Sequence, residues 1–243
     1  MCTVTFVPVK DKIFITSSRD ENILRRNAIP PQLYTFDGGE LIYPRDAAAG
    51  GSWIVMKNNS DAAVLLNGAF FKHIHQPPYA SSRGLVFLDI VKAGNPVEYF
   101  LSTSLYNIEP FTLVLWGSNQ LYECRWDGHR RFQKKLDAGR PHIWSSVTLY
   151  TEDIIMKREM WFAKWVSENN HPQMEDVLRF HRFGGEGDRY NNFCMNRNNM
   201  MLTVSITGMQ LEADKGSMTY MDIKADEQYY SQFEFASEAC CNE

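Results

Sequence analysis

The chain has 243 residues, a formal net charge of −4, 44% hydrophobic residues and 22% charged residues, which is ordinary for a globular protein. This length can bury a sizeable core, and the lack of a basic stripe argues against a nucleic-acid partner or a polybasic membrane contact. No apolar run approaches the roughly 18 residues of a membrane span. No linker-like break occurs, so residues 1–243 are expected to form a single domain.

The first third of the chain predicts two β-hairpins. "TVTFVPV" and "KIFITSS" are rich in β-branched and aromatic residues, and a turn is predicted between them at Lys10 and Asp11. The polar stretch "NAIPPQLYTFDGGE" follows, and its two prolines forbid a regular helix. "GGSWIVMKNNSDAAVLLNGAF" is then typical of a strand, a turn and a second strand.

Helices and further strands alternate along the remaining two thirds of the chain. Hairpins dominate the strands, so the sheets should be largely antiparallel, and helices segregated from such sheets indicate a layered α+β domain. Helices are predicted over residues 81–94, 96–105, 152–169 and 172–183, and strands over residues 111–126 and 198–225.

The N-terminal residues and the cysteines predict the cellular compartment of the protein. Polar residues and a proline interrupt the first ten residues, so no secretory signal peptide is expected. The five cysteines are odd in number and show no zinc spacing, which indicates reduced thiols. We therefore expect a cytoplasmic protein.

The first hairpin places Cys2 beside charged residues. With Lys10 and Asp11 in the turn, the numbers of paired residues sum to about 21, so that Cys2 faces Arg19. Cys2 should then lie close to both Arg19 and Asp20. The alternative is that Cys2 is a buried apolar residue and that the charged run is solvated surface.

A cysteine in this position can act as a nucleophile. If Met1 is removed, the free α-amino group of Cys2 has an ordinary pKa near 8 and can take the proton of its own thiol. The Arg19 guanidinium would stabilise the thiolate, and the Asp20 carboxylate would orient the amine. The sequence thus predicts a catalytic set of Cys2, Arg19 and Asp20.

Several motifs resemble one known family. "MC", "SSRDEN", "GGSW" and "LLNG" are similar to the NRDE family, also called the transport and Golgi organisation 2 family, whose Asn-Arg-Asp-Glu tetrapeptide corresponds to Ser18-Arg19-Asp20-Glu21. The segments "SSRGLVFLDIV", "YNIEPFTLVLWG", "AGRPHIWSS" and "NRNNMMLTVSI" continue the resemblance in order along essentially the whole chain. The Met-Cys-Thr start also resembles the choloylglycine hydrolase and penicillin V acylase group of N-terminal-nucleophile hydrolases.

The resemblance implies a fold and further site residues. The fold would be an αββα sandwich, with two largely antiparallel sheets between helix layers. Asn67 would donate to the oxyanion of a tetrahedral intermediate, although Asn67-Gly68 is also a turn dipeptide. Ser146 and Arg197 would contact substrate. The related proteins have Asn where this chain has Ser146, and a hydroxyl donates one hydrogen bond where an amide donates two.

Two functions follow from the resemblance. The first is an amidohydrolase that cleaves a C–N bond, other than a peptide bond, in a small-molecule amide and needs no cofactor. The alternative is a non-enzymatic protein that binds or traffics haem on the same fold, because family members are implicated in haem movement and in Golgi organisation. His73 and His75 alternate as on one strand face and could contact haem iron or a metal, although such a pair is more typical of a loop.

Overall fold

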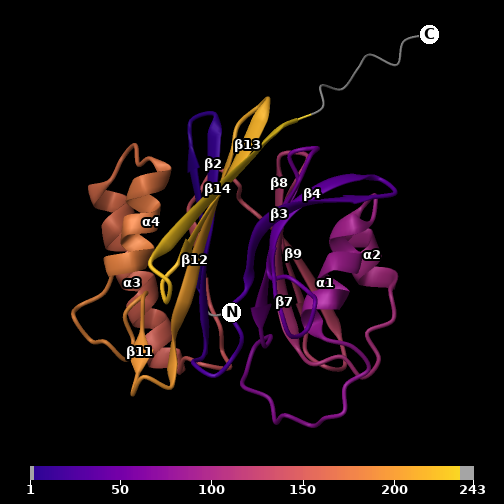
Figure 1. The fold of residues 1–243 in the computed structure, drawn as a ribbon, viewed down its shortest axis with the longest axis horizontal. Helices are drawn as coiled ribbons and strands as arrows, with labels where there is room; N and C mark the ends of the chain where they lie inside the picture. Colours follow the sequence, from indigo (N-terminus) through magenta and orange to yellow (C-terminus); the bar gives the residue numbers. More distant parts are fainter. Residues whose placement is uncertain (1–2, 236–243) are drawn as a thin grey trace.

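The computed structural model describes residues 3–235, which form two seven-stranded antiparallel sheets and four helices (Figure 1). Sheet A has the order β10-β1-β2-β12-β13-β14, with β11 paired to β12, and sheet B has the order β3-β4-β5-β6-β7-β8-β9. The strands of sheet A are β1 (Thr3–Val9), β2 (Lys12–Asn22), β10 (His142–Ser145), β11 (Asn196–Arg197), β12 (Met201–Leu211), β13 (Lys215–Asp222) and β14 (Glu227–Glu234). The strands of sheet B are β3 (Ile29–Phe36), β4 (Gly39–Arg45), β5 (Ile54–Lys57), β6 (Ala62–Asn67), β7 (Phe111–Gly117), β8 (Gln120–Trp126) and β9 (Arg131–Leu136).

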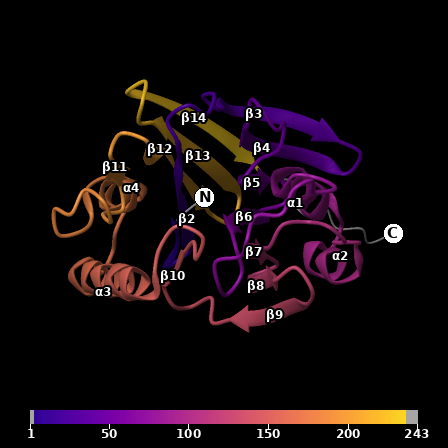
Figure 2. The same cartoon turned by 90° about the horizontal axis from the view of Figure 1, so that it is seen from below.

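The helices cover the outer faces of the two sheets, so the layers follow the predicted αββα order (Figures 1 and 2). One pair packs on sheet A and the other pair on sheet B. These pairs are α3 (Glu152–Glu168) with α4 (Met174–Phe183), and α1 (Arg83–Lys92) with α2 (Pro96–Ser102). The predicted α+β sandwich is therefore confirmed, whereas the single domain stays a prediction.

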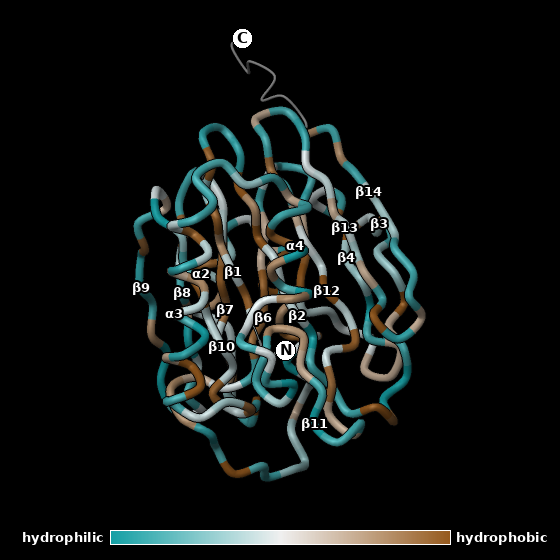
Figure 3. Tube along the Cα trace, turned by 90° about the vertical axis from the view of Figure 1, so that its left-hand side faces the viewer, coloured by the Kyte–Doolittle hydropathy of each residue, from teal (hydrophilic) through white to brown (hydrophobic). Residues whose placement is uncertain are grey.

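Two apolar clusters hold the layers together. The larger lies between the sheets and contains residues such as Phe6, Ile54 and Leu113, and the smaller packs α3 and α4 onto sheet A through residues such as Phe162 and Val177. Hydrophobic stretches accordingly run along the central strands (Figure 3). Among residues 3–235, no helix combines the length and the apolar character that crossing a membrane requires.

The register of the first hairpin agrees with the prediction over the described residues. Val9 pairs with Lys12, and Thr5 pairs with Thr16. The last described pair is Thr3 with Ser18. Cys2 lies outside the described residues, so its pairing with Arg19 stays a prediction.

Some strands were not predicted from the sequence. Residues 27–40, expected only to be non-helical, contain β3 and its turn into β4. Pro30 and Pro31 are tolerated because β3 is an edge strand and the register shifts between Ile29 and Gln32. Three further strands, β9, β10 and β14, occupy sheet edges, where weak alternation of polar and apolar residues gives little signal.

The apolar face of α3 also differs from its sequence pattern. Met160, Trp161 and Trp165 recur near the 3.6-residue period of a helix, which predicts one apolar face. Trp161 and Trp165 do pack partly buried on the smaller cluster, but Met160 is 61% exposed. The helix instead buries Arg158 and Phe162. A periodic pattern could not identify a buried arginine, because charged residues normally lie in solvent.

Candidate active site

A cleft of about 510 Å³ opens between sheet A and sheet B. This volume falls within the range of small-molecule pockets, roughly 300–1,000 Å³. The walls come from β2, from the loop between β4 and β5, from β6 and from the segment that leads into α1. Its main polar lining residues are Arg19, Glu21, Arg25, Asp46, Asn67, His75, Tyr79, Arg83 and Glu109, and Trp53 and Leu65 add apolar surface.

Arg19 is buried at the edge of this cleft. Its Nη2 donates to Oδ2 of Asp46 at 2.8 Å and lies 3.5 Å from Oε2 of Glu21. The guanidinium also stacks over the ring of Trp53, with Cζ 4.5 Å from the ring centroid. Contacts on several sides therefore fix the direction of Arg19.

Asp46 is the carboxylate that organises this corner. Oδ2 accepts hydrogen bonds from Arg19 and from Nε of Arg25, and Oδ1 accepts from the backbone N–H groups of Ala48 and Ala49. Burial opposes its ionisation, but the Ala49 hydrogen bond and the two guanidiniums outweigh burial, so the pKa of Asp46 is lowered. Asp46 thus stays ionised and shares its charge between the two arginines.

Asp20 lies on the opposite face of sheet A from Arg19. Successive residues of a strand point to opposite faces, so Arg19 faces sheet B while Asp20 faces α3 and α4. Tyr150 donates to Oδ2 of Asp20 at 2.8 Å, and the Thr203 hydroxyl donates to Oδ1. The two adjacent residues that the sequence placed beside Cys2 therefore belong to two different networks.

Asn67 ends β6 and lines the cleft from sheet B. Asn67 pairs with Phe111 of the neighbouring strand β7, so it is still a strand residue. The bend begins at the next residue, Gly68, whose φ is +82°. A Cβ at Gly68 would lie 2.7 Å from Cγ2 of Val147 and 2.8 Å from Cγ2 of Thr148. Only glycine fits both this left-handed backbone and this close approach, which fixes the position of Asn67.

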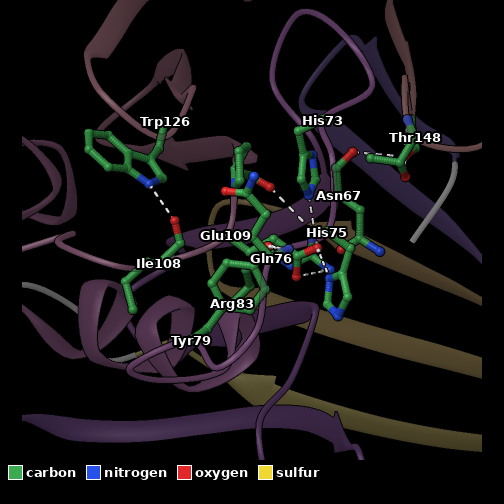
Figure 4. Close-up of polar contacts among 12 residues, drawn as sticks. Asn67, His73, His75, Gln76, Tyr79, Arg83, Ile108, Glu109, Trp126 and Thr148 are labelled. Carbon is green, nitrogen blue, oxygen red and sulfur yellow. Dashed lines mark hydrogen bonds and ion pairs between the residues drawn. The ribbon is translucent and has the colours of Figure 1, made fainter.

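Ser146 is buried beside Asn67 in a smaller cavity of about 150 Å³. Its hydroxyl donates to the backbone carbonyl of Asn67 at 2.7 Å, and Thr148 Oγ1 lies 2.8 Å away (Figure 4 shows Asn67 and Thr148). The single donor of Ser146 is thus used to tie the end of β10 to the end of β6. Contact of Ser146 with a substrate stays a prediction.

Arg197 lies on β11, with Asp20 and Tyr150 rather than at the large cleft. Its guanidinium donates to the carbonyls of Leu149 and Tyr190, at 3.1 and 3.0 Å, and sits over the Tyr150 ring with Cζ 5.3 Å from the centroid. The structure therefore brings Arg19 and Asn67 to one cleft, and Asp20 and Arg197 to another network.

The comparisons with known proteins agree with this fold. The sequence profile of one family, described as Transport and Golgi organisation 2, matches residues 1–181. The chain belongs to this family. A search of curated proteins found no match.

Solved structures of N-terminal-nucleophile hydrolases share the fold of this family member. An N-acylethanolamine-hydrolyzing acid amidase ortholog from Caenorhabditis elegans superposes with a TM-score of 0.59 at 12% identity, covering 86% of this chain and 92% of that chain. Two variants of a conjugated bile acid hydrolase from Clostridium perfringens give TM-scores of 0.56 and 0.53 at 10% identity, covering 100% and 99% of this chain and all of theirs. At such low identity, these likenesses show the fold alone.

His73 and His75 do not lie on a strand, as their spacing had suggested, but in a segment without regular secondary structure. Nε2 of His73 and Nδ1 of His75 lie 2.9 and 3.2 Å from the same oxygen, Oε1 of Glu109, and Figure 4 shows both rings turned toward it. Nη2 of Arg83 lies 2.9 Å from Oε2. Burial opposes ionisation, but Arg83 and the two imidazoles outweigh it and lower the pKa of Glu109. Within residues 3–235, no cluster of His, Cys, Asp and Glu forms a metal site.

Sequence reasoning missed Asp46 and Glu109. Asp46 directly follows β4, and Glu109 lies in the loop before β7. Each reaches its arginine partner only after the chain has folded. The available signals were the place of Asp46, four residues before the "GGSW" motif, and the place of Glu109 within the segment "YNIEPFTLVLWG". A buried arginine such as Arg19 also calls for a carboxylate, but the sequence does not say which one.

Proposed function

We propose that this protein is an N-terminal-nucleophile amidohydrolase that cleaves a C–N bond, other than a peptide bond, in a small-molecule amide bound in the cleft. The observation that carries the proposal is that Arg19 from sheet A and Asn67 from sheet B line one cleft. The confirmed hairpin register ends at Thr3 and Ser18, the residues adjacent to Cys2 and Arg19 in the sequence. In one of the bile acid hydrolase variants of the same fold, residue 2 is a cysteine replaced by alanine.

The proposed reaction has two halves. The α-amino group of Cys2 takes the thiol proton, and the thiolate attacks the amide carbonyl carbon to form a tetrahedral intermediate. The side-chain amide of Asn67 donates to its oxyanion, a contribution worth about 3–4 kcal/mol where such a donor has been removed. The C–N bond then breaks as the leaving nitrogen takes the proton from the ammonium. Water, deprotonated by the same amine, then attacks the carbonyl carbon of the acyl group. The C–S bond breaks, the acyl group leaves as a carboxylic acid, and the Cys2 thiolate takes back the proton from the ammonium.

Arg19 and Asp20 have separate roles in this proposal. Arg19 favours the thiolate from the cleft face, and Asp46 together with Trp53 keeps its guanidinium in place. Asp20 orients the α-amino group from the helix face, where Tyr150 anchors its carboxylate. These separate roles are supported by the positions of Arg19 and Asp20, which are consecutive residues of β2 and so point to opposite faces of sheet A.

The haem-binding alternative draws less support from the cleft. Haem needs apolar walls for the macrocycle and an imidazole available to iron. The lining is mainly polar, and the imidazoles of His73 and His75 both bond to Glu109. Arg83, which could bind a propionate, also pairs with Glu109. We therefore favour hydrolysis over haem transport.

The test begins with the intact mass of untagged protein, which must lack Met1. This protein is then assayed for amine release from N-acylethanolamines, N-acyl amino acids and conjugated bile acids, with haemin titrated in parallel. Turnover of any of these amides that Cys2→Ala abolishes without lowering the thermal unfolding midpoint supports the proposal. The matched control is Cys240→Ala, which should keep full turnover. Turnover retained in Cys2→Ala, or a saturable Soret shift without any turnover, overturns it.

A further inference from the structure

Arg158 is an unusual residue in α3, because a charged side chain with 0% exposure is rare in a protein interior. Within the described part of the chain, its guanidinium forms no ion pair with a carboxylate, and its Nε has no hydrogen-bond acceptor. Burying an unpaired cation is costly, so such a residue calls for an explanation beyond packing.

The contacts of Arg158 converge on the first described residue. Its Nη2 donates to Oγ1 of Thr3, the residue that follows Cys2 in the sequence. Its Nη1 donates to the carbonyls of Asn191 and Asn192 at 2.7 and 2.9 Å. Arg158 therefore ties the beginning of β1 to the segment before β11.

The same guanidinium supports the partner of Asp20. Its Cζ lies 4.2 Å from the centroid of the Tyr150 ring and 4.6 Å from that of Phe193. Tyr150 in turn donates its hydroxyl to Asp20. One side chain thus contacts both the neighbour of Cys2 and the tyrosine that anchors the carboxylate proposed to orient the amine.

We propose that Arg158 is a positioning residue for the N-terminal nucleophile, acting through Thr3 and through Tyr150. The inference rests on the proposed function, because it takes Cys2, at the start of the chain, as the nucleophile that Arg158 helps to position. Arg158 holds the first residues of β1 along the strand and holds the Tyr150–Asp20 pair beside them. A guanidinium suits both tasks, since its planar fork donates in several directions while its face stacks on an aromatic ring.

The charges around Arg158 also predict an electrostatic effect. Arg158 contacts Tyr150, from the loop before α3, and its charge acts on His181 from α4. Through Tyr150 it is linked to Asp20 from β2 and to Arg197 from β11. His181 is neutral, because burial and then the Arg158 charge lower its pKa to about 3. Arg158 and Arg197 thus place two cations on the Tyr150 ring. Asp20, which accepts from the Tyr150 hydroxyl, is the one carboxylate of this network among residues 3–235. This excess of positive charge disfavours a further proton on a nearby amine or thiol.

The experiment uses full-length protein without Met1 and measures the rate of iodoacetamide alkylation of Cys2 against pH. The alkylated tryptic peptide that ends at Lys10 reports Cys2 alone. The variants are Arg158→Gln, Arg158→Lys and Thr3→Val, each checked by its thermal unfolding midpoint. Lys164→Gln, which removes an exposed cation from the same helix, is the matched control.

Arg158→Gln should move the alkylation midpoint upward by about one pH unit, the order expected for losing a nearby charge. Arg158→Lys and Thr3→Val should keep the midpoint but lower kcat roughly tenfold with little change in KM, because only positioning is lost. Lys164→Gln should change neither quantity.

Folded Arg158→Gln and Thr3→Val proteins that both match Lys164→Gln would overturn the inference and leave Arg158 a packing residue. If Arg158→Gln does not fold, kcat in Arg158→Lys and Thr3→Val decides the inference. A lower kcat in these two variants supports it, and a kcat equal to that of Lys164→Gln overturns it. If the wild-type protein turns over no amide, the proposed function fails, but alkylation still decides the role of Arg158. A midpoint in Arg158→Gln that is higher than in Lys164→Gln supports this role, and an equal midpoint overturns it. Where Arg158→Gln is unfolded, an alkylation rate of Thr3→Val that differs from that of Lys164→Gln supports the role, and an equal rate overturns it.

Discussion

Arg19 and Asp46 form an ion pair between the two sheets, with Nη2 of Arg19 lying 2.8 Å from Oδ2 of Asp46. Arg19 lies on β2 of sheet A, whereas Asp46 directly follows β4 of sheet B. The same carboxylate oxygen lies 2.9 Å from Nη2 of Arg25, so one acid neutralises two bases at this edge of the cleft. The pair therefore couples the geometry of the cleft to the packing of the sheets.

Replacing Asp46 by Asn should destabilise the protein by about 2 kcal/mol, because charge-assisted hydrogen bonds to two guanidiniums are lost. The folded-state pKa of Asp46 is lowered, so its stabilisation is present above the ordinary value of 3.8 and is lost as pH falls through the lower folded value. Urea unfolding between pH 2 and 5 should be less pH-dependent in Asp46→Asn than in wild type. The control is Asp226→Asn in an exposed turn, which should retain the wild-type profile. Equal slopes in all three proteins would contradict this account.

Replacing Asn67 by Ala should lower kcat by roughly 10²–10³-fold with little change in KM, because the oxyanion loses its amide donor. The backbone carbonyl that accepts from Ser146 remains, so the fold should survive. Steady-state kinetics on the amide found in the substrate panel check this. Asn170→Ala, an exposed residue after α3, should be kinetically silent. A rise in KM alone would assign Asn67 to ground-state binding instead.

Replacing Gly68 by Ala should destabilise the protein by about 2 kcal/mol more than replacing Gly187 by Ala. Both glycines have nearly the same positive φ, +82° and +83°, so both variants carry the same backbone strain. A Cβ at Gly68 collides with Val147 and Thr148, whereas nothing lies within 4 Å of one at Gly187. Chemical denaturation of the two variants measures the difference. Equal stabilities of the two variants would show that the loop after β10 shifts to make room for the Cβ without lowering the free energy of unfolding.

His181 should make stability fall in mild acid. Its pKa is lowered from 6.5 to about 3 by burial and then by Arg158, and its two ring nitrogens bond to the hydroxyls of Thr5 and Ser18 at 2.8 Å. The folded state thus binds fewer protons than the unfolded state, so stability is full above pH 6.5 and declines toward pH 3, by at most about 1.4 kcal/mol per pH unit.

The measurement for His181 is the free energy of unfolding in urea at several pH values. His181→Gln should be less stable at pH 7 but should lose most of the dependence between pH 6.5 and 4. His171→Gln, an exposed histidine, serves as the control and should keep the wild-type slope. An unchanged slope in His181→Gln would mean that other groups set the acid sensitivity.

The sequence by itself determined the local structure near the proposed nucleophile. The turn at Lys10 and Asp11, with β-branched residues on either side, was enough to predict the register from Val9–Lys12 to Thr5–Thr16. The order of hairpins and helices, with the ordered family motifs, also gave the α+β sandwich. These features depend on neighbours in sequence, where turn chemistry and periodicity act directly.

Only the tertiary structure decided which charged groups meet. Strand alternation separated Arg19 from Asp20, and the packing of sheet B brought Asp46 to Arg19, 27 residues away. Helix α3 carried Arg158 to Thr3 across 155 residues. Such pairs form because a charged group that is buried away from water needs a polar or charged partner. The partner comes from whichever segment the fold packs beside it, so a local sequence pattern cannot predict it.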